Sequence, residues 1–199
     1  MQHLSREDYE KWRVGAEILE TDTHGDKVLR LTDGTFLKLF RRKSWFSKTA
    51  FYPPAKRFAD NATELKRLGI PCPTVLQLYQ LANPYRSVVH YEPLPGMTLR
   101  QLLTDDPDLD QLELFARLAE FITHLHDLGV YFRSLHMGNI VLTPENELGL
   151  IDISDMRCIG RPLPRRMRDR NYRHLLRYEQ DWAMVNPQIG TLFMFSKPR

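Results

Sequence analysis

The sequence predicts an α+β protein in two lobes, a small antiparallel β-rich lobe over residues 1–95 and a reduced helical lobe over 96–199. Short apolar runs with a period near two fill the first part, and apolar residues at helical spacing dominate the second. Between them, the stretch EPLPGM at 92–97 carries two prolines and one glycine, which interrupt both kinds of element. The change of period and this break together indicate the division into two lobes.

The first lobe should contain an antiparallel sheet of five strands, all within residues 15–92. Each expected strand is a short apolar run, and the segments between the runs are rich in Gly, Asp, Asn and Pro, which favour turns. The expected strands are 16–20, 27–31, 35–40, 74–81 and 86–92.

Helical spacing predicts one helix in the first lobe and a long helix in the second. The first follows Pro54 and stops before Gly69, with an apolar face made by Phe58, Ala62, Leu65 and Leu68. A short helix begins near Thr98. The long helix covers 108–130, and its expected buried face consists of Leu112, Phe115, Leu118, Ala119, Ile122 and Leu125. Two short β-like runs follow, and a basic, largely helical tail closes the chain.

Composition points to an ordinary soluble protein, because 42% of the 199 residues are hydrophobic and 27% are charged. The two cysteines, Cys72 and Cys158, lie far apart without a CxxC pattern, so we expect neither a disulfide framework nor a zinc site. No signal peptide and no run near the roughly 18 apolar residues of a membrane span is visible. We expect a cytoplasmic protein, with peripheral attachment at the inner membrane face left open.

Positive charge is concentrated in two segments, although the net charge is only +3. The segment from Arg161 to Arg177 has seven arginines and one acid, Asp169, and a second cluster lies at 38–48. Arginine suits bidentate contact with phosphate or carboxylate. Two interpretations stay open, a solvated helix face or a surface for an anionic partner such as a membrane. Nucleic acid is the least supported partner, because few aromatic residues are interleaved for base stacking.

Several short motifs occur in the order in which protein kinases carry them. FRSLHMGN at 132–139 resembles the kinase catalytic loop, with Ser134 at the catalytic aspartate position and Asn139 at the asparagine position. LIDIS places Asp152 at the aspartate of the D-F-G motif, and TFLKLF places Lys38 at the nucleotide-binding lysine. On these motifs the chain resembles the protein-kinase-like superfamily, and within it the bacterial lipopolysaccharide-core sugar kinases and the RIO-like kinases.

This resemblance implies a two-lobed kinase fold that uses ATP and Mg²⁺. Asn139 and Asp152 would hold the metal ion, and Lys38 would contact the nucleotide phosphates. Gly25, the single glycine of TDTHGDK, lies where kinases have a glycine-rich phosphate loop. The resemblance also implies a hinge in VVHYEPLPGM, where Glu92 and Leu94 would contact the nucleotide.

Ser134 is the main departure from the kinase pattern, because a serine hydroxyl is uncharged at neutral pH and is a poor base. A positioned general base contributes typically about 10²–10⁴-fold to a rate. Arg133 precedes the serine, as an arginine does in kinases, and His136 and Asp155 are the nearby residues that would substitute for the missing carboxylate.

A second departure concerns the partner of Lys38. The register of the first helix places Asn61 where kinases have the pairing glutamate, and Glu64 lies one turn later. The favoured interpretation is a kinase-like protein with weak or lost phosphotransfer, a pseudokinase. The alternatives are an active ATP-dependent kinase of a glycolipid-core sugar or another hydroxyl acceptor, and a protein that binds an anionic partner.

Overall fold

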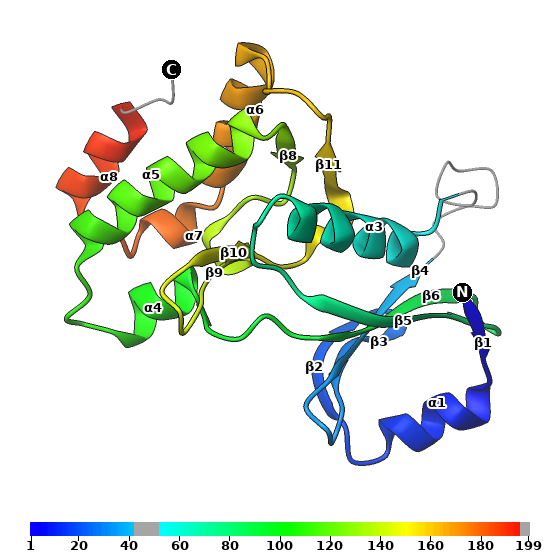
Figure 1. The fold of residues 1–199 in the computed structure, drawn as a ribbon. Coiled ribbons are helices and arrows are strands. Elements are labelled where there is room, and N and C mark those ends of the chain that lie inside the picture. Colours follow the sequence, from blue (N-terminus) through cyan, green and yellow to red (C-terminus); the bar gives the residue numbers. More distant parts are fainter. Residues whose placement is uncertain (42–51, 196–199) are drawn as a thin grey trace. The chain divides into compact units, whose positions relative to one another are not determined.

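The computed structural model describes residues 1–41 and 52–195, so that part of the basic cluster at 38–48 lies outside the described residues. The chain forms two compact units (Figure 1). The first unit comprises residues 1–63 and 72–93, and the second comprises residues 64–71 and 94–199. The first is rich in strands and the second in helices, which confirms the predicted α+β class.

The first unit is built on a six-stranded sheet with the strand order β1-β5-β6-β4-β3-β2. All five predicted strands are present. Their observed bounds are β2 (Glu17–Asp22), β3 (Gly25–Arg30), β4 (Phe36–Arg41), β5 (Thr74–Leu81) and β6 (Arg86–Glu92). The expectation of a purely antiparallel sheet within 15–92 was wrong, because β1 (Gln2–Leu4) adds a parallel strand beside β5. Three residues are too few to show an alternating pattern.

Helices cover both faces of this sheet. One of them, α1 (Arg6–Arg13), was not predicted from the sequence, and its first turn is capped by the Ser5 hydroxyl. Most of α1 is polar, and among its side chains only Tyr9 is fully buried. Tyr9 packs with sheet residues that include Leu37 and Leu39. Because side chains alternate along a strand, Lys38 points to the opposite face.

The helix predicted after Pro54 is α3 (Pro54–Arg67), and its first part packs on the sheet face that carries Lys38. Its Phe58 ring lies 5.2 Å from the ring of Tyr91 in β6. Phe58, Ala62 and Leu65 are buried as predicted.

Within residues 94–195, the second unit is made of helices joined by short strands, and it also includes the end of α3. The helices are α4 (Leu99–Asp105), α5 (Gln111–Asp127), α6 (Arg165–Leu176), α7 (Glu179–Trp182) and α8 (Pro187–Phe195). The strands are β7 (Met97–Thr98), β8 (Val130–Phe132), β9 (Ile140–Leu142), β10 (Leu148–Leu150) and β11 (Met156–Cys158). Strands β10, β9 and β7 form one small sheet, and β11 pairs with β8.

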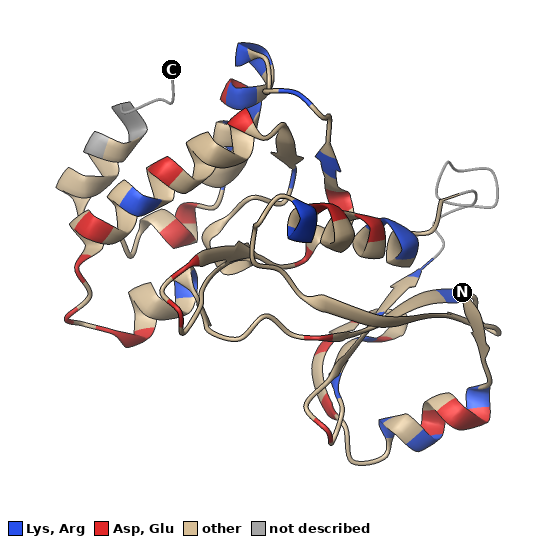
Figure 2. Cartoon of the chain, in the orientation of Figure 1, with Lys and Arg blue, Asp and Glu red and all other residues tan. Residues whose placement is uncertain are grey.

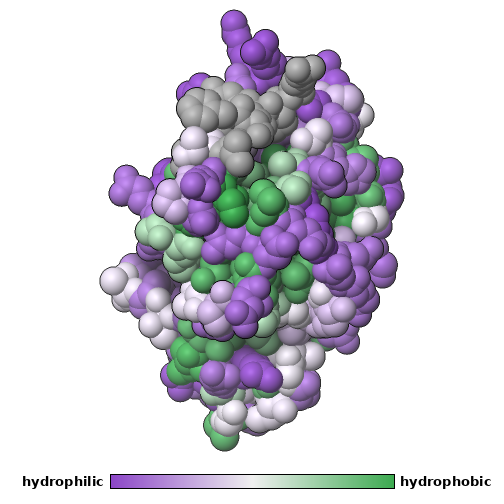
Figure 3. All heavy atoms as spheres, turned by 90° about the vertical axis from the view of Figure 1, so that its left-hand side faces the viewer, coloured by the Kyte–Doolittle hydropathy of each residue, from purple (hydrophilic) through white to green (hydrophobic). Residues whose placement is uncertain are grey.

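The long helix α5 buries a face that differs from the predicted one at its start. Leu112 is 61% exposed, whereas Leu114 and Phe115 are buried. The reason is that packing begins at Leu114 and Phe115, and the ring of Phe115 contacts those of Trp182 and Phe193. Leu112, in the first turn, lies outside this cluster. On the face shown in Figure 3, apolar side chains form small groups separated by polar ones.

A close approach of two backbones follows α5. Gly129 has φ +79, and a Cβ atom there would lie 2.2 Å from the carbonyl oxygen of Arg161. Only glycine fits this position without displacing the segment that leads into α6. Within the described residues, no helix is long and apolar enough to cross a membrane.

Candidate functional site

The loop at 133–139 links β8 to β9 and ends in a short 3-10 turn, η1 (Met137–Asn139). Alternate residues of the loop, Leu135, Met137 and Asn139, are buried and fix it in the second unit. A second 3-10 turn, η2 (Ile153–Asp155), follows β10. The N–H of Ile151 donates a hydrogen bond to the carbonyl of Asn139 at 3.0 Å. The two kinase-like motifs of this unit are therefore neighbours in space.

Ser134 has a carboxylate partner in the second of these turns. Its Oγ donates a hydrogen bond to Oδ2 of Asp155 at 2.6 Å. The other oxygen of Asp155, Oδ1, is buried and has no hydrogen-bond partner among the described residues. A buried acceptor without a partner is costly, and in native proteins such an atom often has a function. The position where kinases have an aspartate therefore has a carboxylate beside it, supplied by another turn.

Asn139 presents an oxygen suited to a hard cation. Its side chain is 7% exposed, and its Nδ2 donates to the carbonyl of Ser134 at 2.9 Å. This bond fixes the orientation of the amide and leaves Oδ1 without a hydrogen bond within 1–41 and 52–195. Magnesium prefers such oxygen ligands and usually keeps several waters.

Asp152 lies at the start of η2 in the left-handed region, with φ +53 and ψ +42. Asp tolerates this conformation better than most residues do. Non-glycine residues in the left-handed conformation often lie at functional sites. In the described part of the chain, no three His, Cys, Asp or Glu side chains group into a metal site. Asn139 and Asp152 therefore fit magnesium only in the manner of nucleotide sites, where phosphate and water complete the ligands.

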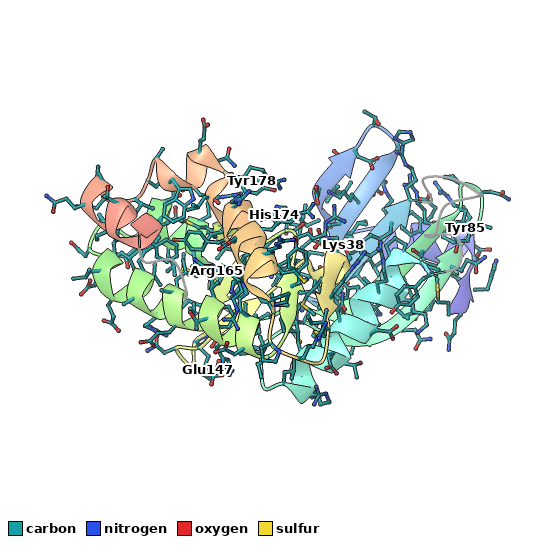
Figure 4. All side chains as sticks on the ribbon, turned by 90° about the horizontal axis from the view of Figure 1, so that it is seen from above. Lys38, Tyr85, Glu147, Arg165, His174 and Tyr178 are labelled. Carbon is teal, nitrogen blue, oxygen red and sulfur yellow. The ribbon has the colours of Figure 1, made fainter. Side chains whose placement is uncertain are left out.

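The contacts of His136 favour a structural role. Its Nδ1 accepts a hydrogen bond from the N–H of Gly138 at 3.1 Å. Burial, and then the nearby Arg100 guanidinium, lower the pKa of His136. The ring is therefore neutral at pH 7, and the hydrogen-bond pattern assigns its proton to Nε2. The single ring lone pair, on Nδ1, is therefore engaged by the N–H of Gly138. The ring packs 4.4 Å from that of Tyr178, which is labelled in Figure 4.

Asp181 also holds the loop at 133–139 in place, and it was not among the residues predicted from the sequence. Its side chain is fully buried. One oxygen accepts from Nε of Arg100 at 2.6 Å, and the other accepts from the N–H of Met137 at 3.2 Å. Asp181 lies in the four-residue helix α7, outside any motif, so no pattern in the sequence indicated its role.

The basic segment is largely the exposed face of α6, visible as blue residues in Figure 2. Of its seven arginines, only Arg168 forms an ion pair within the described residues, with Asp127 at 2.7 Å. His174, labelled in Figure 4, lies among several of these charges. Its pKa is lowered by burial first, and then by Arg177, Arg170 and the exposed Arg133 of the loop. The arginines thus continue from α6 to the catalytic-like loop.

The remaining predicted site residues are divided between the two units. Lys38 is buried in β4, with Nζ 5.8 Å from the ring centroid of Phe40. Gly25 begins β3 with φ +110, and the space around its Cα is open. Asn61 is half-buried in α3, and Glu92 is an exposed residue at the end of β6. These four residues belong to the first unit.

Glu64 and Leu94 belong to the second unit, with Ser134 and its neighbours. Both carboxylate oxygens of Glu64 accept hydrogen bonds from Arg67, at 2.7 and 2.8 Å. Glu64 therefore has a local partner on its own helix. Leu94 lies against Gly149 of β10, where a Cβ atom would come within 2.6 Å of it.

Comparison with solved structures finds chains of low sequence identity. The monomeric form of WbdD is 16% identical, with a TM-score of 0.49, and the match covers 85% of this chain and 38% of that one. A co-crystal of WbdD and the kinase inhibitor LY294002 is 16% identical with a TM-score of 0.43, covering 67% and 30%. A third structure, described as the bifunctional kinase-methyltransferase WbdD, has the same identity and score, covering 67% and 29%. This chain thus spans less than two fifths of the solved chains.

No curated protein matches the chain. Residues 9–192 match the model of the lipopolysaccharide kinase (Kdo/WaaP) family. The match covers nearly the whole chain and includes every motif discussed above. The chain belongs to the lipopolysaccharide kinase (Kdo/WaaP) family.

Proposed function

We propose that this chain binds a magnesium–ATP complex and transfers phosphate slowly to a hydroxyl group of a lipopolysaccharide-core sugar or a similar acceptor. In this proposal Asp155 takes over part of the role of the absent catalytic aspartate. Membership in a kinase family supports the reaction class. The observation that carries the proposal is the hydrogen bond from Ser134 to Asp155.

A base must lie within hydrogen-bond reach of the proton that it accepts. The Ser134 hydroxyl donates its hydrogen bond to Asp155. The lone pairs of Ser134 Oγ therefore remain available to accept a hydrogen bond from an acceptor hydroxyl. The acceptor proton would move to Ser134 Oγ as the serine proton moves to Asp155 Oδ2. An indirect transfer of this kind is less effective than a carboxylate in direct contact, and we therefore expect slow turnover.

The cofactor contacts follow from the residues present. Asn139 and Asp152 would hold Mg²⁺, and Lys38 with the turn at Gly25 would contact the nucleotide phosphates. Glu92 and Leu94 would lie at the nucleotide from the linking segment, and Asn61 would replace the glutamate that usually steadies the lysine. When bound, the metal ion would neutralise charge that develops on the phosphates.

Calorimetry with magnesium–ATP and measurement of ATP turnover test the proposal together. Asp152→Ala should weaken binding by at least about tenfold, because the alanine side chain cannot replace the carboxylate as a ligand of Mg²⁺. Ser134→Ala should leave binding almost unchanged and lower turnover. If the unaltered chain binds the nucleotide without turnover, and Asp155→Asn has no effect, the chain is a binding module. Absence of nucleotide binding would overturn the proposal.

A second function is supported by the charge of α6. We propose that its unpaired arginines bind an anionic surface, such as the cytoplasmic face of a membrane, since only Arg168 has a carboxylate partner in the described residues. Binding to vesicles with anionic lipid should fall steeply with added salt. Charge reversal at Arg166 and Arg170 should abolish it, whereas reversal at Arg117, which binds Asn146 away from this segment, should not. Unchanged binding would identify an ordinary solvated face.

A further inference from the structure

A pocket of about 350 Å³ lies in the first unit, outside all the kinase motifs except the turn at Gly25. It is enclosed by one face of α1, the turn between β2 and β3, and the turn between β5 and β6. Its volume lies at the lower end of the range of small-molecule sites and is far larger than a bound water requires. Buried apolar side chains, Leu39 and Leu81, form part of its wall.

Both acidic side chains of the pocket wall already have partners. Glu10 forms an ion pair with Arg6 at 2.9 Å. Asp26 accepts from Nε of Arg13 at 2.6 Å and from the hydroxyl of Tyr9 at 2.8 Å. Neither acid is therefore left to neutralise a further cation in the wall.

That further cation is Arg86, the first residue of β6, which is only 5% exposed. Its guanidinium has five N–H donors. In the described part of the chain, it makes one hydrogen bond, from Nη2 to the carbonyl of His24 at 2.6 Å, and no ion pair. Arg41 of β4 is its direct cross-strand neighbour, so a second positive charge lies on the same face.

Asp22 is the acid that interacts with these two arginines. Its pKa is lowered, chiefly by the hydrogen bond from the N–H of His24, and to a smaller degree by Arg86 and Arg41. Its carboxylate is exposed and does not reach ion-pair distance of either arginine. The guanidinium of Arg86 lines the pocket, so an anion in the pocket can accept hydrogen bonds from its remaining N–H donors.

We propose that this pocket binds a small organic molecule that carries a phosphate or carboxylate group. The anionic group would lie on the guanidinium of Arg86, which can bind it through two parallel N–H donors. The organic part would pack against Leu39, Leu81 and Pro84. Because Arg86 also holds the carbonyl of His24, the ligand would restrain the turn that contains Gly25. The site is independent of the proposed phosphotransfer.

The probes are inorganic phosphate and acetate. Each is titrated separately, with chloride at the same ionic strength as the control. In the unaltered chain, NMR should show saturable shifts at His24, Gly25 and the Arg86 Nε–H group. The stronger of the two anions identifies the preferred head group. Arg86→Met should weaken that binding by at least tenfold. Arg30→Met is the matched control, because Arg30 is an exposed arginine that pairs with Glu17 outside the pocket.

The shift map of the unaltered chain decides the question even if Arg86→Met does not fold. Shifts confined to α6 or to the loop at 133–139 would place the anion elsewhere and overturn the proposal. The proposal would also be overturned if Arg86→Met bound the anion as tightly as the unaltered chain does. The same holds if neither anion gave saturable shifts.

Discussion

Replacing Ser134 by Asp restores a carboxylate at the catalytic position, and the sequence alone predicts at least a tenfold gain in ATP turnover. The structure alters this expectation, because Ser134 Oγ lies 2.6 Å from Asp155 Oδ2. Two carboxylates about 4 Å apart repel by about 1 kcal/mol in water and about 4 kcal/mol at an effective dielectric constant of 20. At the upper value the two carboxylates share a proton, and the single variant loses part of the base that it introduces.

The double variant Ser134→Asp with Asp155→Ser removes this repulsion and keeps one hydroxyl and one carboxylate in contact. Its turnover should exceed that of the unaltered chain by at least about tenfold. It should exceed the single variant by about five- to a thousandfold, which corresponds to the 1–4 kcal/mol of repulsion. The assay is ATP turnover at saturating nucleotide, with calorimetry to show that nucleotide affinity is unchanged.

Three results of this experiment would each contradict one step of the prediction. If Ser134→Asp alone equals the double variant, the carboxylates do not repel as calculated. If Asp155→Asn turns over ATP as fast as the unaltered chain, Asp155 is not the base. If neither variant with Asp at 134 gains activity while binding is preserved, another step limits the reaction.

Other variants test the fold around the site. Gly129→Ala should destabilise the chain more than Gly69→Ala in urea denaturation, since both glycines have positive φ but only Gly129 faces a carbonyl at 2.2 Å from the added Cβ. Asp181→Asn should lower the free energy of unfolding by about 1–3 kcal/mol, because it removes the charge from the hydrogen bond to Arg100, whose side chain is 35% exposed and stays partly solvated. Lowering the pH from 7 to 5 should also lower that free energy. Burial lowers the pKa of His126 in the folded chain. Below about pH 6.5 the unfolded chain therefore takes up a proton that the folded chain does not, and protonation favours unfolding. His126→Gln should flatten this dependence, and the exposed His124→Gln should not.

Periodicity, together with Gly and Pro at the breaks, predicted the central strands and the longer helices. The five central strands and α3 have clear patterns, but β1 is too short to show one and α1 buries only Tyr9 fully. The prediction of a buried Leu112 was wrong, because a helical pattern does not record at which turn of the helix the packing begins.

The site could be predicted only where a local motif marks it. Ser134, Asn139 and Asp152 lie in recognisable motifs, and Asp155 was named only because it is near them in sequence. Asp181 acts on Met137 from 44 residues away, and Arg86 lies in a strand of ordinary composition. Long-range hydrogen bonds of this kind depend on the packing of distant elements, which no local pattern records.

The link between Asp181 and the loop has a consequence for the order of folding. The N–H of Met137 and the guanidinium of Arg100 find their common acceptor only after the chain has closed over 44 and 81 residues, respectively. Contacts of such separation form late, because the entropy of loop closure must be overcome first. The catalytic-like loop and helix α7 should therefore become ordered in one cooperative step. Amide hydrogens in both segments would exchange with solvent at a common rate, and a protease cut before α7 would release the loop together with the helix.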